Sequence, residues 1–402
     1  MKQRIWENQS VQVLLLGVIG VPIGAIVGVI DVIFGKVLLQ LTSIREMHPI
    51  VLLPFLAVAG AWIVFSYSKF GGTSSKGMNL IFEVGHGQED NIPFRLIPLV
   101  ISGTWFTHLF GGSAGREGVA VQIGATFSHC VGKKIPIKNA SHIFLITGMA
   151  AGFAGLFQTP MAAIVFAMEV LVAGTLQYQA LVPACTAAFT ANYVSKALGL
   201  EKFSYMLHID LSLNGTLFLK LILLGVIFGL VGAVFAKGLQ WTKKMAGHYI
   251  QSPMMRIVII GASISVLSLI CHMGRYSGLG TNLISDSFHG QSIFAYDWLL
   301  KLLFTIVTLA AGFQGGEVTP LFSIGASFGV VLASMFQLPI VFVAALGYVS
   351  VFASATNTLF AAIFIGGEVF GYAYLPYFLI VCIIAYSCNQ NVSIYSLQKL
   401  HK

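Results

Sequence analysis

The residues best suited to chemistry lie in a glycine-rich segment, residues 111–124, which reads GGSAGREGVAVQIG and places Arg116 and Glu117 before an apolar run. This pattern predicts a loop that leads into a helix, and the free N–H groups of a helix N-terminus bind anions. A carboxylate at such a place can occupy the anion site when ionised and leave it when protonated. Glu117 is therefore a candidate for both a gate and a proton carrier. The alternative is an Arg–Glu pair that only caps a helix.

Other polar residues offer further candidates. Glu317 precedes Thr319-Pro320, a polar residue followed by proline that is typical of a helix start. From the residues alone, Glu317 is explained as a surface cap of this helix. Ser113 would suit an intramembrane serine hydrolase if a histidine served as its base. The histidines available for that role are His108, His129 and His142.

Composition places these candidates in a membrane. The 402 residues are 57% hydrophobic and 9% charged, and the mean hydropathy is +0.87. A soluble enzyme carries far more charge, and a disordered chain is much less apolar. The 22 Lys and Arg are scattered, without a basic stretch that would bind nucleic acid. Long apolar runs, rather than short alternating strands, indicate an all-α polytopic membrane protein instead of a β-barrel.

Glycine and cysteine refine this picture. The 43 glycines exceed the usual share and indicate close helix contacts and helices broken within a span. Many apolar runs are only 14–18 residues long, which predicts short, tilted or partial spans. The five cysteines form no CxxC pair. The sequence therefore indicates no metal site and no cofactor.

The chain also repeats itself. Blocks near residues 15–19, 77–87, 123–127 and 159–170 recur in the same order about 200 residues further on. The last of these blocks pairs Glu169 with Glu368, and a structural role is favoured for both. We expect a first membrane repeat at 1–200, a linker at 201–214 and a second repeat at 215–402.

Charges suggest how the repeats are oriented. Both termini are basic, with Lys2, Arg4, Lys399 and Lys402, whereas the linker is net acidic. The positive-inside rule then predicts cytoplasmic termini and repeats of opposite topology. Inverted repeats of this kind build a substrate site at the midplane from broken helices.

The segment Gly115-Arg116-Glu117-Gly118-Val119-Ala120-Val121-Gln122 resembles the signature of the CLC family of chloride channels and anion/proton antiporters. The resemblance extends over nearly the whole chain, including the repeat, and implies a CLC-like fold. It also implies that Glu117 is the external gating glutamate. Backbone groups of Gly115, Arg116, Gly118 and Val119 would then line the anion path.

Departures from the chloride-type pattern are informative. The family's Gly-Ser-Gly-x-Pro loop, whose serine hydroxyl holds the anion, corresponds to Gly77-Met78-Asn79-Leu80 here. Val119 stands where many relatives have proline. The second-half loop reads Gly316-Glu317-Val318-Thr319-Pro320. This combination resembles the fluoride/proton-exchanging subgroup of bacteria and implies that Met78, Asn79, Val318 and Thr319 contribute to the anion site.

Two further positions follow from the resemblance. The family's paired acids become Glu169-Val170, so the usual internal proton-transfer glutamate is missing, and Glu317 is the candidate replacement. Tyr395 resembles the tyrosine whose hydroxyl contacts the central anion, with a tyrosine at the membrane interface as the alternative.

The resemblance as a whole implies a fluoride/proton antiporter that exports fluoride across a bacterial inner membrane, embedded in the lipid bilayer as a homodimer. A chloride/proton antiporter or a passive chloride channel on the same fold is the main alternative. A cation-coupled transporter and the serine hydrolase are more remote. No nucleic-acid partner is expected.

Overall fold

Helices account for nearly all of the regular structure in the computed structural model, which describes residues 9–389 and 392–400. Lys2, Arg4 and Lys402, on which part of the predicted orientation rests, lie outside these residues. The helices up to residue 200 are α2 (Gln9–Met47), α3 (Pro49–Leu52), α4 (Leu56–Ser66), α5 (Met78–Gly85), α6 (Leu96–Leu109), α7 (Glu117–Gly132), α8 (Ala140–Phe157), α9 (Pro160–Glu169) and α10 (Leu181–Ala197).

An extended segment without helix covers residues 200–214 and leads to the remaining helices. These are α11 (Gly215–Tyr249), α12 (Pro253–Ile270), α13 (Thr281–Phe288), α14 (Asp297–Ala311), α15 (Val318–Phe336), α16 (Ile340–Thr356), α17 (Leu359–Phe370) and α18 (Leu375–Ser387). Single turns of 3₁₀ or π helix are η1 (Leu53–Phe55), η2 (Tyr67–Gly71), η3 (Gly72–Lys76), η4 (Tyr178–Ala180), η5 (His272–Gly274) and η6 (Tyr372–Tyr374). The short strands β1 (Val172–Ala173) and β2 (Lys399–Leu400) pair in parallel.

Six helical stretches in the described residues are long and apolar enough to cross a membrane. They are Val11–Met47, Pro49–Gly85, Ala140–Phe157, Gly215–Tyr249, Pro253–Ile270 and Val318–Phe336. Their surroundings differ, because 89% of the α8 stretch is buried inside the protein but only 28% of the α12 stretch is. A buried span therefore lies at the centre, and spans that present apolar side chains outward lie around it. This arrangement confirms the predicted polytopic helical class.

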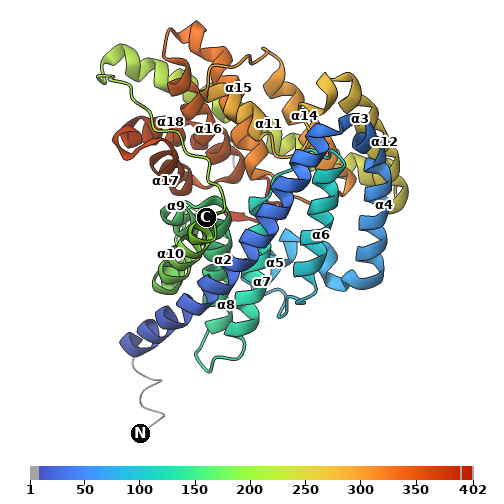
Figure 1. Cartoon of the computed structure of the whole chain (residues 1–402). Coiled ribbons are helices and arrows are strands. Elements are labelled where there is room, and N and C mark those ends of the chain that lie inside the picture. Colours follow the sequence, from blue (N-terminus) through green and yellow to red (C-terminus); the bar gives the residue numbers. More distant parts are fainter. Residues whose placement is uncertain (1–8, 390–391, 401–402) are drawn as a thin grey trace.

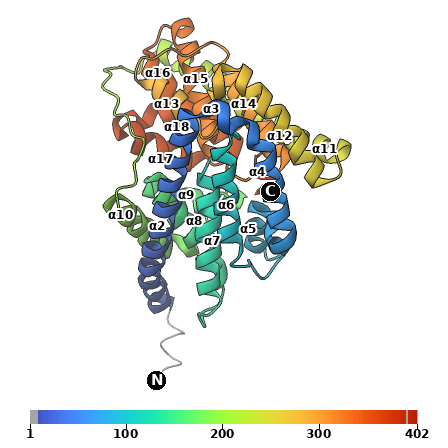
Figure 2. The same cartoon turned by 45° about the vertical axis from the view of Figure 1, so that its right-hand side comes forward.

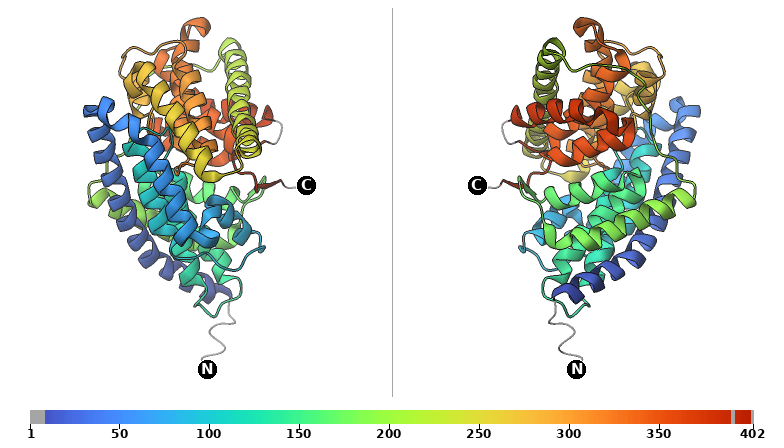
Figure 3. Two further views of the ribbon diagram at one scale, coloured as in Figure 1. Left: turned by 90° about the vertical axis from the view of Figure 1, so that its right-hand side faces the viewer. Right: turned by 90° about the vertical axis from the view of Figure 1, so that its left-hand side faces the viewer.

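Helices from the same part of the chain pack together (Figure 1). α7 lies against α8 and α15 lies against α16, while α2 runs along the outside against α10 and α8. Figure 2 shows α4 beside α12. This contact joins a helix before residue 200 to a helix after residue 215. The opposite views in Figure 3 show helices before residue 200 gathered on one side and those after residue 215 on the other.

Glycine lets the innermost helices approach each other closely. A Cβ on Gly124 of α7 would collide with the carbonyl oxygen of Gly148 on α8. The same contact recurs between Gly325 of α15 and Gly347 of α16. Small residues at such crossings allow backbones to touch in a membrane protein. The predicted use of glycine for close packing is thus confirmed at the two helices that begin at Glu117 and Val318.

Gly124→Ala should lower the free energy of unfolding by about 1–3 kcal/mol, because the added methyl group overpacks the α7–α8 crossing. The thermal unfolding midpoint of the detergent-purified protein measures this. Gly215→Ala is the matched control, since a Cβ there meets no atom within 4 Å. Equal midpoints for the two variants would contradict the crossing's importance.

Candidate functional site: an anion path between two helix N-termini

Two helix N-termini meet at the centre of the molecule. α7 begins at Glu117 and α15 begins at Val318. The loops before them pair as antiparallel backbone, with Gly115 N to Gly316 O at 2.5 Å and Gly316 N to Gly115 O at 2.8 Å. A Cβ on Gly115 would lie 3.0 Å from the Gly316 carbonyl oxygen, so the approach requires glycine. The positive ends of both helix dipoles therefore point into one small region.

The Glu117 carboxylate lies in this region and is 1% exposed. Its Oε2 accepts hydrogen bonds from the backbone N–H of Arg116 at 3.3 Å and of Thr319 at 3.2 Å. The Thr319 hydroxyl also donates to the same oxygen. Two backbone amides and one hydroxyl are donors that suit a small anion. The carboxylate thus occupies a set of donors that could hold a small anion in its place.

Arg116 supplies positive charge beside this carboxylate. Its side chain is buried, and Nε lies 3.8 Å from Glu117 Oε1. Within the described residues, Nε and Nη1 of Arg116 and Oε1 of Glu117 make no hydrogen bond. Val119 and Val318 are almost fully buried, so they offer backbone groups and apolar walls to the site. The guanidinium and the carboxylate are therefore close without being locked together.

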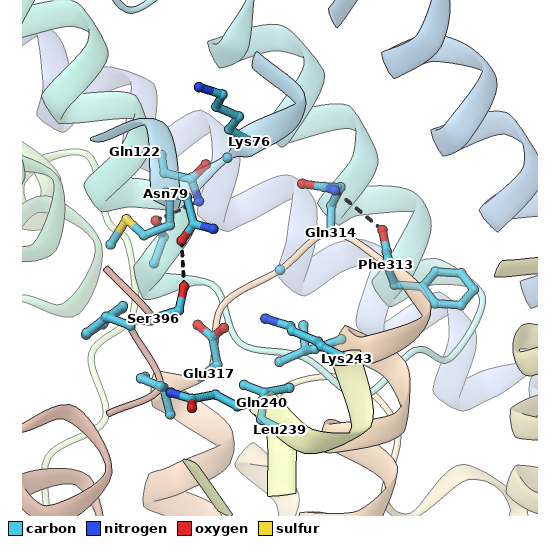
Figure 4. A pocket seen from close by; sticks show the side chains of 18 of the residues that line it. Lys76, Asn79, Gln122, Leu239, Gln240, Lys243, Phe313, Gln314, Glu317 and Ser396 are labelled. Atoms are coloured by element: carbon cyan, nitrogen blue, oxygen red, sulfur yellow. Dashed lines mark hydrogen bonds between the residues drawn. The ribbon is translucent and has the colours of Figure 1, made fainter. Parts of the chain in front are cut away.

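A pocket of about 220 Å³ lies next to these N-termini, with Gly118 and Glu317 in its wall (Figure 4). Five predicted site residues line it, namely Met78, Asn79, Gly118, Glu317 and Tyr395. Glu117 and Thr319 lie behind Gly118 and Glu317, in the hydrogen-bonded cluster described above. The structure thus brings predicted residues of both chain halves together, five of them in the pocket wall and others in this buried cluster.

The first turn of α5 presents Met78 and Asn79 to the pocket. Gly77, just before it, has φ +54°, a conformation that glycine adopts without strain. Further along α5, Phe82 stacks on Tyr395 with ring centroids 5.3 Å apart. The Tyr395 hydroxyl is buried and has no hydrogen-bond partner in the described part of the chain. It is therefore a free donor at the edge of the pocket.

Tyr395 lies outside any helix, in residues 392–400, which we name the C-terminal strap. The strap crosses several helix ends. Ser396 Oγ donates to Asn79 Oδ1 at 3.3 Å, and Gln398 Nε2 donates to the carbonyl oxygens of Val170 at 2.9 Å and Thr356 at 3.0 Å. Beyond these contacts, β2 pairs with β1. The strap therefore holds Tyr395 against the pocket.

The surroundings of Ser113 support a structural role for this residue rather than that of a hydrolase nucleophile. Ser113 Oγ bonds to Thr305 Oγ1 at 2.8 Å and accepts from Lys301 Nζ at 2.8 Å. Lys301 also donates to the carbonyl oxygens of Tyr276 and Gly278, at 3.1 and 2.7 Å. Lys301 Nζ thus lies within hydrogen-bond distance of three acceptors from two different loops. Its role is to join the Ser113 loop to the 276–278 loop.

The three histidines considered as bases are committed elsewhere. The ring of His108 bonds to the carbonyl oxygens of Thr104 and Ala114. The ring of His129 bonds to those of Ser141 and Asp90, and His142 bonds to Gln177. These partners hold the rings in fixed orientations and leave Ser113 without a histidine base among the described residues.

Glu169 and Glu368 have the structural role that their repeat positions predict. The Glu169 carboxylate, at the end of α9, accepts from the backbone N–H of Ala361 at 2.8 Å, in the first turn of α17. Reciprocally, Glu368 near the end of α17 accepts from the N–H of Ala162 at 2.9 Å and of Met161 at 3.1 Å in α9. Each acid thus caps the other half-helix and satisfies N–H groups that lipid cannot.

The sequence did not identify Lys243 and Gln240 as site residues, although both line the pocket. They lie three residues apart on α11, far in sequence from both loop motifs. A lysine after a long apolar run is typical of a membrane interface, so its type alone gave no signal. Their spacing in the sequence predicts that both lie on one face of a helix. The sequence does not show which element this face contacts.

The fold, the paired helix N-termini and the buried glutamate are the features by which the chain can be assigned to a protein family. Residues 56–390 match the family model described as voltage gated chloride channel. The chain therefore belongs to the CLC family, and the resemblance seen in its sequence is confirmed.

Individual relatives narrow the comparison. The chain is 35% identical over 366 residues to a "chloride/fluoride channel protein" of Pseudomonas syringae pv. tomato, which covers 89% of this chain and 80% of the relative. Among solved structures it is 52% identical to a CLC-type fluoride/proton antiporter, with a TM-score of 0.96 over 98% of this chain and all of the other. A slow cyanobacterial Cl⁻/H⁺ antiporter, 20% identical with a TM-score of 0.80, covers 93% of this chain and 94% of its own and shares the fold.

Lys301→Met should destabilise the protein by about 3–5 kcal/mol, because the methionine leaves Ser113 and two carbonyl oxygens without their buried donor. Chemical or thermal unfolding in detergent measures the loss. The exposed Lys196→Met provides the control and should be near neutral. A stable Lys301→Met protein would refute the bridging role of this lysine.

Proposed function

We propose that this chain is a fluoride/proton antiporter that exports fluoride from the cytoplasm in exchange for protons. The observation that carries the proposal is the Glu117 carboxylate, bonded to the N–H groups of Arg116 and Thr319 and to the Thr319 hydroxyl. A side chain that fills an anion site with its own charge competes with the transported anion. The 52% identity to a structure described as a fluoride/proton antiporter supports fluoride as that anion.

The exchange follows from the two charge states of Glu117. When ionised, the carboxylate fills the site and blocks the anion. Protonation from outside removes the charge that the two helix N-termini stabilise, so the side chain leaves its donors. Fluoride then takes the amides of Arg116 and Thr319 and the Thr319 hydroxyl, with backbone from Gly118 and Val119 around it. The protonated side chain passes its proton inward, and the carboxylate that this leaves then returns to its donors and displaces fluoride.

The first loop supports fluoride through its likeness to the fluoride/proton-exchanging subgroup, because Met78 stands where chloride-type relatives have a serine. Met78 has no hydrogen-bond donor. It therefore cannot make the hydrogen bond to the anion that the serine hydroxyl makes in chloride-type relatives. Fluoride is small and strongly hydrated, and its water must be replaced by close donors. The amide of Asn79, the free hydroxyl of Tyr395 and the amides at the start of α15 are the donors on the path.

Glu317 completes the proton path in this proposal. It lies at the start of α15, beside Gly118 on one side and the pocket on the other. A Cβ on Gly118 would be 3.9 Å from Glu317 Oε2, which puts this carboxylate next to the backbone that carries Glu117. Glu317 can therefore take the proton that Glu117 brings and release it into the pocket.

Assembly and orientation belong to the same proposal. We expect a homodimer in the bacterial inner membrane, each subunit with its own path, and both termini in the cytoplasm. Residues 1–200 and 215–402 would be inverted repeats joined by the 201–214 linker. The matched glycine crossings and the reciprocal caps of Glu169 and Glu368 support two equivalent halves.

Proteoliposomes loaded with fluoride should show efflux coupled to proton uptake, followed with a fluoride electrode and a pH readout. Glu117→Gln should abolish the proton coupling, because an amide side chain neither takes up nor releases a proton in this pH range. Equal movement of chloride would favour a chloride/proton antiporter, and anion movement without protons would favour a passive channel. Unchanged coupling in Glu117→Gln would remove this residue from the mechanism.

Glu317→Gln should reduce proton-coupled fluoride efflux by tenfold or more (about 1.4 kcal/mol on the barrier), since it removes the inner proton acceptor but leaves the anion donors in place. Binding of fluoride to the detergent-purified variant, measured by calorimetry, should be retained. Wild-type rates of coupled efflux would show that Glu317 only orders the start of α15.

A further inference from the structure

Lys243 faces Glu317 across the pocket. Leu239, Gln240 and Lys243 form one face of α11, and all three line the cavity. Leu239 is 1% exposed, and Gln240 Nε2 donates to the Ser393 carbonyl oxygen at 2.6 Å. These contacts fix the helix one turn before the lysine. Figure 4 shows the Lys243 ammonium and the Glu317 carboxylate directed toward the same space.

Lys243 brings an unshared positive charge to this space. In the described part of the chain it makes no ion pair with any acid within 4.0 Å, but its charge acts on Glu317. The other basic residue at the pocket, Lys76, is paired with Glu83 at 2.6 Å and Glu89 at 3.1 Å. Its charge is thus largely balanced.

The other titratable groups near Glu317 bring no unpaired positive charge into the pocket, because Arg116 pairs with Glu117 and does not line it. Tyr395, on the C-terminal strap, is a phenol and neutral near pH 7. Glu117, on α7, is an acid with Arg116 beside it. Lys243 is therefore the one unpaired cation among the described residues that line the pocket with Glu317.

We propose that Lys243 is a positioning residue for proton release, which stabilises the ionised form of Glu317 so that it gives up its proton to the pocket. The proposal rests on the function proposed above. A proton acceptor at the inner end of the path must also let its proton go at cytoplasmic pH. A nearby ammonium ion that stays out of direct contact favours the carboxylate without occupying it. The gap between them leaves Glu317 free to exchange protons with water in the pocket.

The test is the pH dependence of coupled fluoride efflux in proteoliposomes, with the internal and external pH varied together. Lys243→Gln removes the charge, so the carboxylate holds its proton up to a higher pH. The midpoint of the profile should move toward alkaline pH by about 0.5–1 unit. Lys243→Arg should restore the wild-type midpoint, and raising the salt concentration should shrink the difference between Lys243→Gln and wild type.

The neighbouring Lys244 is a matched control. It is also exposed on α11 but does not line the pocket, so Lys244→Gln should leave the midpoint unchanged. In the Glu317→Gln background, Lys243→Gln should produce no further shift. A wild-type profile for Lys243→Gln, with coupling intact, would overturn this inference alone. Absence of proton coupling in the wild-type protein would instead overturn the proposed function.

Discussion

The bond between Glu117 and the first turn of α15 is the interaction on which the rest of the structure depends. It joins a carboxylate from α7 to the N–H and hydroxyl of Thr319, more than 200 residues later in the chain. An acid in an apolar interior is costly unless it is hydrogen-bonded. Here the compensation comes from groups that an anion would use equally well. In the proposed function, the stability of the closed path and the affinity of the open one would therefore draw on the same donors.

Helices that stop inside the protein create such donors but also create a problem elsewhere. Every broken end leaves N–H and carbonyl groups that lipid cannot satisfy. The protein meets this need with buried side chains that differ from end to end. Glu169 and Glu368 cap each other's half-helices, and Lys301 binds the carbonyl groups of two loops. The start of α15 is capped by Glu117, the group that we propose leaves its donors when it is protonated.

Much of this could be predicted from local sequence. Glycines around Arg116 and Glu117, and the proline after Thr319, favour helix starts through their backbone conformations. The internal repeat paired Glu169 with Glu368. Lys243 and Gln240 could not be found in this way, because their importance depends on which element α11 packs against. Lys301 was missed for the same reason: the sequence shows a lysine in an apolar helix, whereas its three acceptors come from two other loops. Tyr395 was placed by resemblance, but the non-helical strap that carries it was not expected.

The C-terminal strap has a consequence for biosynthesis. Tyr395 and Ser396 line the pocket, and Ser396 contacts Asn79 at the start of α5. These residues leave the ribosome after α18, when all of the described helices have already been made. A nascent chain can therefore insert its spans and pair its helix N-termini while the inner end of the path still lacks its tyrosine. The wall of the pocket is therefore completed only when the strap docks, as one of the last steps of folding.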